Sequence, residues 1–491
     1  MRKRFQQQTT LGILPVSEVK INTKSRDELP PVLVALQQIF VTDELNQSIF
    51  TLLEEKIVDT KKKTGRPGMD LWHILVLAIV RHTLNTNWDR MEYLSNNDKS
   101  LRKIMGVHVE KFGIEEIEFA YQTIVDNVSL IDEEMLQSIN DIVVSYGHKL
   151  LKKKDELVVL KLKTDSFAVE TNVHFPTDLN LLYDSLRKGI ETIASLCKQD
   201  QTIKGWRKHK SIIAEVKSLF RTASHKLFKG KDEAAKIISV KNYLQKATAI
   251  NKRLQAIVIE SASITTITAL HTYTGYITKF TNQIKRRILN GETIPSEEKL
   301  YSIFETHTEW ITKGKLNKKV ELGHLVLITT DQHSFIVDYK TMEKQKDAQQ
   351  IEGLCKRIET KFATCTISSH SFDKGFWSKD NLEILNNHNV ETVVLPKRGN
   401  YTKADKERES NRAFKVLKRK HSAVESNINM LEHHGLNRCA DKGIKHFKNY
   451  VGLSVLAYNL HQLGNKIIAI KNKEEEKNLQ KIKRMLLKVA A

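Results

Sequence analysis

The first part of the chain is a polar stretch followed by a long helical pattern. Residues 1–30 are polar and end at Pro30, which predicts a flexible arm. From Val32 to about Gly147, apolar residues recur every three or four positions, the spacing that places them on one face of a helix. No run in this region alternates as a strand does. We therefore predict an all-α N-terminal domain, over residues 31–150; a small, basic all-helical domain is a form that DNA-recognition modules take.

The pattern changes to that of a β-strand at Glu156. The run ELVVLKLKTDSFAVETNV is rich in Val and Leu, and its middle part alternates between two faces. One face holds Leu160, Leu162 and Thr164, and the other holds Lys161, Lys163 and Asp165. We predict that Asp165 lies at or near the end of this strand. An aspartate on a strand otherwise suited to burial needs a partner or a cation.

A long helical section follows and continues to about Asn290. Its first helix carries one apolar stripe, made of Leu179, Leu182, Leu186, Ile190, Ile193 and Cys197. Basic runs recur at helical spacing, which predicts a basic helical insertion over residues 185–314. The run KGWRKHK supplies four candidate DNA-binding residues, Lys204, Trp206, Arg207 and Lys208. The alternative for Trp206, anchoring one helix on another, fits the sequence at least as well.

Strands and helices alternate after the insertion. Two β-rich runs between Lys318 and Met342 flank Asp331, which predicts a hairpin. Further segments predict a helix, a short strand from Ala363, a helix and a short buried strand. The charged segment from Lys397 predicts a loop or a frayed helix, and two helices follow it. The boundaries are then 151–184 and 315–465 for one α/β domain, and 466–491 for a charged C-terminal helix.

The stretch SHSFDKGFWSKDN contains a second acidic candidate. Asp373 comes just after a predicted strand and close to Gly375, and ligands of open α/β sheets bind outside the carboxyl ends of strands. Asp-x-Gly is also ordinary turn chemistry, so Asp373 alone does not establish a site. Glu425 lies beside the apolar face of a predicted amphipathic helix from His421. Together with Asp165, these residues form a set of three carboxylates from distant segments.

Three carboxylates brought together in this way fit a magnesium site. Mg²⁺ prefers oxygen ligands and is commonly held by a few carboxylates together with phosphate oxygens of the substrate. Two such ions, roughly 3.5–4 Å apart, activate the attacking oxygen and stabilise the leaving one in phosphoryl transfer. Asp165, Asp373 and Glu425 are therefore candidate catalytic residues and ligands of two divalent ions, Mg²⁺ or, as a substitute, Mn²⁺. This chemistry alone does not separate a nuclease from a transposase.

Composition adds a strongly basic charge balance. The 491 residues include 79 Lys and Arg against 58 Asp and Glu, a formal net charge of +21. An excess of this size is typical of proteins with a polyanionic partner such as nucleic acid, although a merely soluble basic protein is the alternative. The basic residues are scattered and form no single cluster beside an apolar segment, which does not favour a membrane partner.

Other features favour a reduced, intracellular globular protein. The hydrophobic fraction is 40% and the charged fraction 28%, values typical of folded soluble chains. The start MRKRFQQQTTLG lacks the apolar core of a secretory signal, and the longest apolar run, LWHILVLAIV, is too short to span a bilayer. The cysteines show no zinc-ligand spacing: they are Cys197, Cys355, Cys365 and Cys439.

A further candidate DNA contact lies in the run KKKTGRPGMD, from Lys61 to Asp70. Three lysines followed by Gly-Arg-Pro are able to place Arg66 in a minor groove. The segment is equally compatible with an ordinary loop at the start of a helix. Both interpretations of Arg66 remain open from the sequence.

Several motifs resemble those of DDE transposases of bacterial insertion sequences. They are GRPGMDLWHILVLAIVRHTL, TDSFAVETNVHFPTDLNLL around Asp165, VELGHLVLITTD, SFDKGFWSKDN around Asp373 and HSAVESNINMLEHHGLNRCADKG around Glu425. The resemblance covers most of the chain from about residue 60 to residue 465. It implies an α/β RNase H-like catalytic domain with a large helical insertion after the first strand, preceded by an all-α N-terminal domain. It also implies that the three acidic residues ligate the metal ions.

The resemblance implies an activity and a set of partners as well. The chain would bind the terminal inverted repeats of its element and target DNA, as a homodimer or a larger synaptic complex, in the bacterial cytoplasm at the nucleoid. Related transposases usually carry a basic residue four positions before the glutamate and a lysine seven positions after it; here these are His421 and Glu432. His421 is thus a candidate DNA contact. Two alternatives remain: a decayed or domesticated transposase that only binds DNA, and a nuclease without strand transfer.

Overall fold

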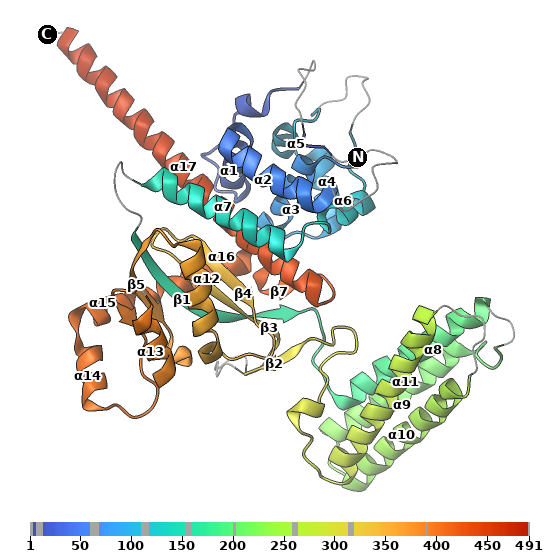
Figure 1. The fold of residues 1–491 in the computed structure, drawn as a ribbon. Helices are drawn as coiled ribbons and strands as arrows, with labels where there is room; N and C mark the ends of the chain where they lie inside the picture. Colours follow the sequence, from blue (N-terminus) through green and yellow to red (C-terminus); the bar gives the residue numbers. More distant parts are fainter. Residues whose placement is uncertain are drawn as a thin grey trace. The chain divides into compact units, whose positions relative to one another are not determined.

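The chain forms two compact units (Figure 1). Unit 1 consists of Met1–Asn172 and His324–Ala491, and unit 2 of Val173–Gly323. A computed structural model of the protein describes residues 3–5, 13–58, 68–109, 117–152, 159–199, 203–257, 264–312, 319–388 and 390–489. Most of these residues are helical, and their strands form one mixed sheet.

Seven α-helices precede the first strand in the described part of the chain, and no strand interrupts them there, as the periodicity predicts. They are α1 (Leu29–Val41), α2 (Asp43–Leu53), α3 (Leu71–Thr83), α4 (Trp88–Asn97), α5 (Lys99–Met105), α6 (Tyr121–Val128) and α7 (Glu133–Leu151). Pro30 and Pro31 occupy the first turn of α1, where a missing N–H costs no helical hydrogen bond. Asp132 caps α7 by accepting the N–H of Met135.

The predicted flexible arm is wrong for the part of residues 1–30 that leads into α1. Val16 and Val19 are buried there. The side-chain amide of Gln37, on α1, donates to their carbonyl oxygens at 2.7 and 2.9 Å. The segment from residue 13 onward therefore packs on α1, because its few apolar residues are enough to anchor a polar stretch.

The sheet has the strand order β2-β3-β1-β5-β6, with β4 paired to β3 and β7 paired to β1. The strands are β1 (Val159–Thr171), β2 (Glu309–Ile311), β3 (Glu321–Thr330), β4 (Ile336–Thr341), β5 (Thr366–Phe372), β6 (Val393–Val394) and β7 (Arg438–Cys439). β3 and β4 form the predicted antiparallel hairpin. β1 pairs with β5 in parallel, and β5 with β6 in parallel. Two distant segments thus lie side by side at the centre.

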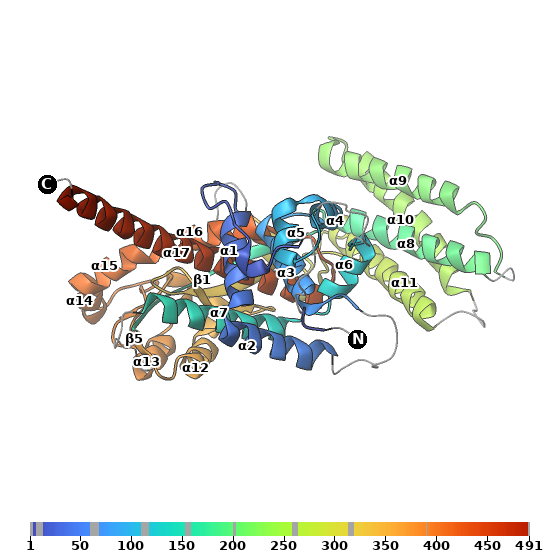
Figure 2. The same ribbon diagram turned by 90° about the horizontal axis from the view of Figure 1, so that it is seen from above.

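Helices cover both faces of the sheet. The helices that follow the β3–β4 hairpin are α12 (Ile351–Lys361), α13 (Lys379–Asn387), α14 (Lys403–Ser410), α15 (Arg412–His421), α16 (Ala423–Leu431) and α17 (Ile444–Val489). Figure 2 shows α12 and α13 on one side of β1, and α15 and α16 on the other. The predicted alternation along β1 is confirmed: Leu160 and Leu162 share a core with α12, whereas Phe167 and Val169 share one with α16.

Helix α17 is one continuous helix that joins the predicted last buried helix to the charged C-terminal helix. Its first half packs against α1, α3 and α7, and its C-terminal part is exposed. A Cβ at Gly464 would lie 1.8 Å from the carbonyl oxygen of Pro31, so α1 and α17 approach as closely as their backbones allow. This contact explains a glycine inside a long helix, where it otherwise lowers stability.

Unit 2 contains four long helices, α8 (Asp178–Gln199), α9 (His209–Lys229), α10 (Glu233–Gln255) and α11 (Ile264–Ile284). The predicted apolar stripe of α8 is confirmed, since Leu182, Leu186 and Ile190 are buried in a core shared with the other three helices. The predicted insertion, residues 185–314, lies inside the range of this unit.

The charged segment from Lys397 contains the ordered helix α14. Thr402 accepts the N–H of Asp405, and the Asp405 carboxylate accepts the N–H of Thr402 in return. This capping box starts the helix where the composition alone suggests a loop or fraying. In the described residues, every helix is either too short or too polar to span a membrane.

Candidate active site

Asp165 lies inside β1 and not at its end, so the predicted position at the strand terminus is wrong. The strand continues to Thr171 because Phe167 and Val169 are buried in a hydrophobic core and Thr171 pairs with β7. Asp165 is half-buried, and one carboxylate oxygen accepts the N–H of Ser166 at 2.7 Å. The position of Asp165 is nevertheless informative, because the neighbouring parallel strand β5 ends beside it.

Asp373 follows directly after β5, the parallel neighbour of β1. The last paired residues of the two strands are Thr164 and Phe372, so Asp165 and Asp373 are the next residues of each strand. Neighbouring strands lie about 4.8 Å apart, and side chains alternate between faces, so these carboxylates emerge close together on the same face. Asp373 is exposed, and within the described residues its side chain makes no hydrogen bond or ion pair. The sheet itself therefore brings the two predicted aspartates together.

Glu425 lies in the first turn of α16, a helix that packs against β1. The side chain is exposed, and among the described residues it makes no hydrogen bond or ion pair. It lies one helical turn after His421, which ends α15. The helix that carries Glu425 thus covers the same sheet face from which the two aspartates emerge.

His421 joins this helix to the sheet. Its Nδ1 and the hydroxyl of Ser371 form a hydrogen bond of 3.0 Å. Burial lowers the pKa of His421, nearby Asp373 acts in the opposite direction, and Lys163 adds to the lowering. Its buried Nε2 has no hydrogen-bond partner among the described residues. The predicted DNA contact is therefore a half-buried imidazole beside Asp373, more enclosed than a surface basic residue.

The donor chemistry of the site suits a hard divalent cation, although the protein alone does not assemble a complete ligand set. Asp165, Asp373 and Glu425 offer carboxylate oxygens, the ligand type that Mg²⁺ prefers. Within the described residues, no three His, Cys, Asp or Glu side chains are arranged to hold a metal ion. Two adjacent carboxylates are enough for Mg²⁺ when phosphate oxygens and water complete its shell.

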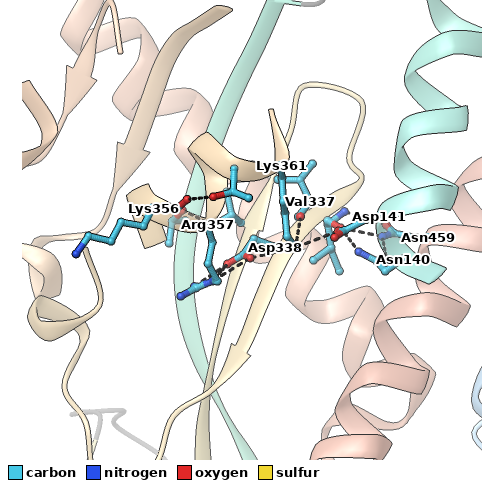
Figure 3. Close-up of polar contacts among 12 residues, drawn as sticks. Asn140, Asp141, Val337, Asp338, Lys356, Arg357, Lys361 and Asn459 are labelled. Atoms are coloured by element: carbon cyan, nitrogen blue, oxygen red, sulfur yellow. Dashed lines mark hydrogen bonds and ion pairs between the residues drawn. The ribbon is translucent and has the colours of Figure 1, made fainter. Parts of the chain in front are cut away.

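Asp338 on β4 and Asp331 just after β3 are, by contrast, neutralised by the protein. Asp338 is 1% exposed and is paired with Arg357 at 2.7 Å and with Lys361 at 3.3 Å (Figure 3). Lys361 also pairs with Asp141 of α7 at 3.0 Å. Asp331 is fully buried and bonds to His148 Nε2 at 2.6 Å. These acids hold α7 and α12 to the sheet, which leaves the exposed carboxylates as the candidates for chemistry.

A buried polar chain supports β1 from the opposite face. The hydroxyl of Thr164 contacts Thr329 Oγ1 at 2.7 Å and His370 Nε2 at 2.8 Å. Burial, together with nearby His421, lowers the pKa of His370 to about 3, so this imidazole is neutral. These bonds tie β3, β1 and β5 together directly below Asp165.

A cavity of about 440 Å³ adjoins the carboxylates and was not expected from the sequence. It lies between β1, β5 and the junction of α15 and α16, and both Lys163 and Lys420 line it. Lys163 Nζ donates to the carbonyl oxygen of Asp331 at 3.2 Å. Burial lowers the pKa of Lys163; Asp331 opposes this effect, and Lys420 adds to it. The alternation along β1 indicated the face of Lys163, but α15 is too distant in sequence to be paired with it.

The remaining predicted DNA-binding residues lie elsewhere. Arg66 falls outside the described residues. Lys204, Arg207 and Lys208 are exposed in unit 2. Trp206 is 3% exposed, and the guanidinium of Arg253 lies 4.5 Å from its ring centre. The structure therefore contradicts base stacking by Trp206 and supports the alternative role of a helix anchor, because a ring inside a helical core presents no free face to a base.

Comparison with known protein families, curated proteins and solved structures gives no match to this chain. The assignment of a function therefore depends on the residues and the geometry described above.

Proposed function

We propose that this protein is a DDE-type transposase that cleaves the ends of its insertion sequence and joins them to target DNA in a metal-dependent reaction. The observation that carries the proposal is the parallel pairing of β1 with β5. Its register places Asp165 and Asp373 next to each other, and α16 brings Glu425 to the same face. The order of the three residues along the chain is that of the DDE motif.

The arrangement of elements supports an RNase H-like catalytic domain. The sequence predicts the order strand, helical insertion, two strands, helix, strand, helix, strand and helix. The structure follows this order with β1, the helices of unit 2, β3 and β4, α12, β5, α13, β6 and α16, and adds the short strands β2 and β7 and the helices α14 and α15. A mixed sheet covered by helices on both faces is compatible with that fold, and with the family that the motifs resemble.

The proposed chemistry follows from the metal ions that the three carboxylates would bind. Asp165, Asp373 and Glu425 would bind two divalent ions, Mg²⁺ or Mn²⁺, which activate the attacking oxygen and stabilise the leaving oxygen of a phosphodiester. The exposed Asp373 and Glu425 leave room for phosphate oxygens beside the carboxylates. The buried Thr164–His370 chain holds β1 and β5 in register, so it fixes the separation of the two aspartates. His421, whose imidazole lies beside Asp373, would contact the DNA strand there.

The charge of the protein supports double-stranded DNA as the partner. A net charge of +21 attracts the phosphate backbone, while bound cations would offset the acidic site itself. Lys204, Arg207 and Lys208 give unit 2 an exposed basic run that suits DNA. Synapsis of two ends by a homodimer or a larger assembly belongs to the same proposal.

The test is a joining assay. Linear DNA that carries the sequences flanking the gene is incubated with purified full-length protein, a supercoiled target plasmid and Mg²⁺ or Mn²⁺. We expect cleaved ends and joined products, and a loss of roughly 10²-fold or more in Asp165→Asn, Asp373→Asn and Glu425→Gln. Asp380→Asn is the matched control, because Asp380 is an exposed aspartate on α13 outside the site.

The same assay separates the alternatives. Cleavage without joining would identify a nuclease, and a DNA mobility shift without either product would identify a protein that only binds DNA. If Asp165→Asn and Glu425→Gln both retained full joining activity, the site assignment would be wrong.

A further inference from the structure

The cavity next to the candidate active site has a basic, hydroxyl-rich lining. It has a volume of about 440 Å³ and opens between the odd-numbered face of β1 and β5 and the start of α16. Its polar lining includes Lys161, Lys163, Ser369, Ser371, Lys420 and Ser422. Among the residues that the structure describes, no acidic side chain lines it. A space of this composition suits a small anionic group.

Three lysines, Lys161, Lys163 and Lys420, provide the positive charge. Lys163 extends from the centre of the sheet and is half-buried, whereas Lys420 projects from the last turn of α15 and is exposed. They come from distant segments and meet only across the cavity. Lysine ammonium groups are common phosphate ligands, because each provides three donors and a full charge.

Ser369 adds a donor that the protein does not use. It is 4% exposed and lines the cavity, and its hydroxyl makes no hydrogen bond with any described residue. The hydroxyl oxygen is open to the cavity, so water or a ligand there can complete its hydrogen bonding. Ser371, two residues on, is already bonded to His421.

The start of α16 forms one wall of the cavity. Ser422 and Ala423, at the start of this nine-residue helix, both line the cavity. The side chain of Ser422 bonds back to the carbonyl oxygen of Arg419 and does not cap α16. The N–H of Glu425 bonds to the backbone carbonyl oxygen of Ser422 at 3.1 Å, and α15 ends only one residue before α16, so the positive charge of the cavity comes from its lysines and not from this helix terminus.

We infer that this cavity binds one phosphodiester group of the DNA strand that enters the candidate active site. The inference deepens the proposed function and rests on it. Lys163 and Ser371 each precede the acidic residue of their strand by two positions, which is about 7 Å along a strand. The bound phosphate is thus one or two nucleotides from the reacting one, given a rise of about 3.4 Å per nucleotide. The site positions the strand and takes no part in bond breakage.

The experiment measures DNA binding by the full-length protein in EDTA, so that cleavage does not interfere. Fluorescence anisotropy at several salt concentrations gives the slope of log affinity against log salt. Lys163→Gln and Lys420→Gln should each reduce that slope by about 1 and weaken binding equally for unrelated sequences. Lys163→Arg and Lys420→Arg keep the positive charge and should therefore retain the wild-type slope. Lys415→Gln, an exposed lysine on α15 outside the cavity, should leave it unchanged.

A second arm locates the phosphate. A single neutral methylphosphonate is moved along the strand around the cut site. It should weaken binding to the wild type at one position within two nucleotides of the cut, but not binding to the Lys163→Gln/Lys420→Gln double variant. This loss of additivity reports a direct contact.

Free phosphate is the other source of the same chemistry. Inorganic phosphate that raises the melting temperature of the wild type but not of the double variant, with unchanged DNA slopes, would show a small-anion site and overturn the inference. Unchanged slopes in an enzyme that still joins DNA through Asp373 would also overturn it, while leaving the proposed function intact. Reduced slopes in a protein that never cuts DNA would support the cavity and contradict the catalytic proposal.

Discussion

Two classes of acidic residue in and around the sheet can be distinguished by their surroundings. Asp331 and Asp338 are buried and surrounded by cationic or N–H partners. Asp373 and Glu425 are exposed and have no such partners among the described residues. A buried carboxylate must be neutralised by the protein, whereas an exposed one remains available to an ion from solution. The first class should therefore affect stability when changed, and the second class activity.

Asp338 offers a test of the first class. Asp338→Ala leaves Arg357 and Lys361 without their shared carboxylate (Figure 3). We expect the free energy of unfolding to fall by about 3 kcal/mol, because a partly buried charge loses its partner. Urea denaturation measures the change. Asp380→Ala, at an exposed position, should change it by less than about 0.5 kcal/mol; similar losses in both variants would contradict this assignment.

His370 makes stability depend on pH. Its folded pKa, about 3, lies below the ordinary value near 6.5, so between these pH values the unfolded chain binds a proton that the folded chain does not. The free energy of unfolding is therefore highest above pH 6.5 and decreases as the pH falls toward 3. This histidine should account for a decrease of about 2 kcal/mol between pH 7 and pH 5.

The comparison that isolates this effect is His370→Gln against the wild type at both pH values, by urea denaturation. The variant should show a pH dependence smaller by that amount. His446→Gln, at an exposed position, should retain the wild-type dependence. An unchanged dependence in His370→Gln would mean that the imidazole is not buried as the structure shows.

At the scale of elements, α1 and α17 cross with their backbones in close contact at Gly464. Gly464→Ala should destabilise unit 1 by about 1–3 kcal/mol despite the better helix propensity of alanine, because the new Cβ meets the Pro31 carbonyl. Gly275, on α11, has open space at the same position and is the matched control. Gly275→Ala should stabilise its helix by about 0.5–1 kcal/mol. Thermal unfolding measures both, and a stabilising Gly464→Ala would contradict the close approach.

Elements with a regular period could be predicted from the sequence, whereas their ends and neighbours could not. Alternation with period two identifies the two faces of β1, and the stripe of α8 follows a period of 3.6. The end of β1 was misplaced, because the apolar residues after Asp165 are recruited by a core that distant helices complete. The order along the chain gives the three acidic candidates. The proximity of Lys163 and Lys420 in one cavity, and the burial of Trp206, depend on contacts between distant segments, which the local sequence pattern does not contain.

At the scale of the whole molecule, unit 2 is inserted between two neighbouring strands. Thr164 contacts Thr329, and Lys161 contacts Gln332, so β1 and the segment that ends β3 run in opposite directions. The chain therefore leaves unit 1 after Asn172 close to where it returns at His324. A short link between these two points is geometrically feasible.

Replacing residues 173–323 with a short Gly-Ser linker should leave unit 1 folded. The deletion removes no residue of its two hydrophobic cores. We expect cooperative unfolding at a melting temperature within several degrees of the same transition in the full chain. Calorimetry and far-UV circular dichroism measure it. Loss of the cooperative transition would show that unit 1 depends on unit 2 to fold.

The position of the insertion also determines how long β1 precedes β5 during synthesis. β1 leaves the ribosome long before β5, since Thr164 and His370 are 206 residues apart. At a translation rate of about 5–20 residues per second, β1 waits roughly 10–40 s for its parallel partner. During that time unit 2, whose contacts are local, has ample opportunity to fold first. The nascent chain must keep an unpaired, Val- and Leu-rich strand from aggregating, which makes β1 the segment where a ribosome-bound chaperone would be needed most.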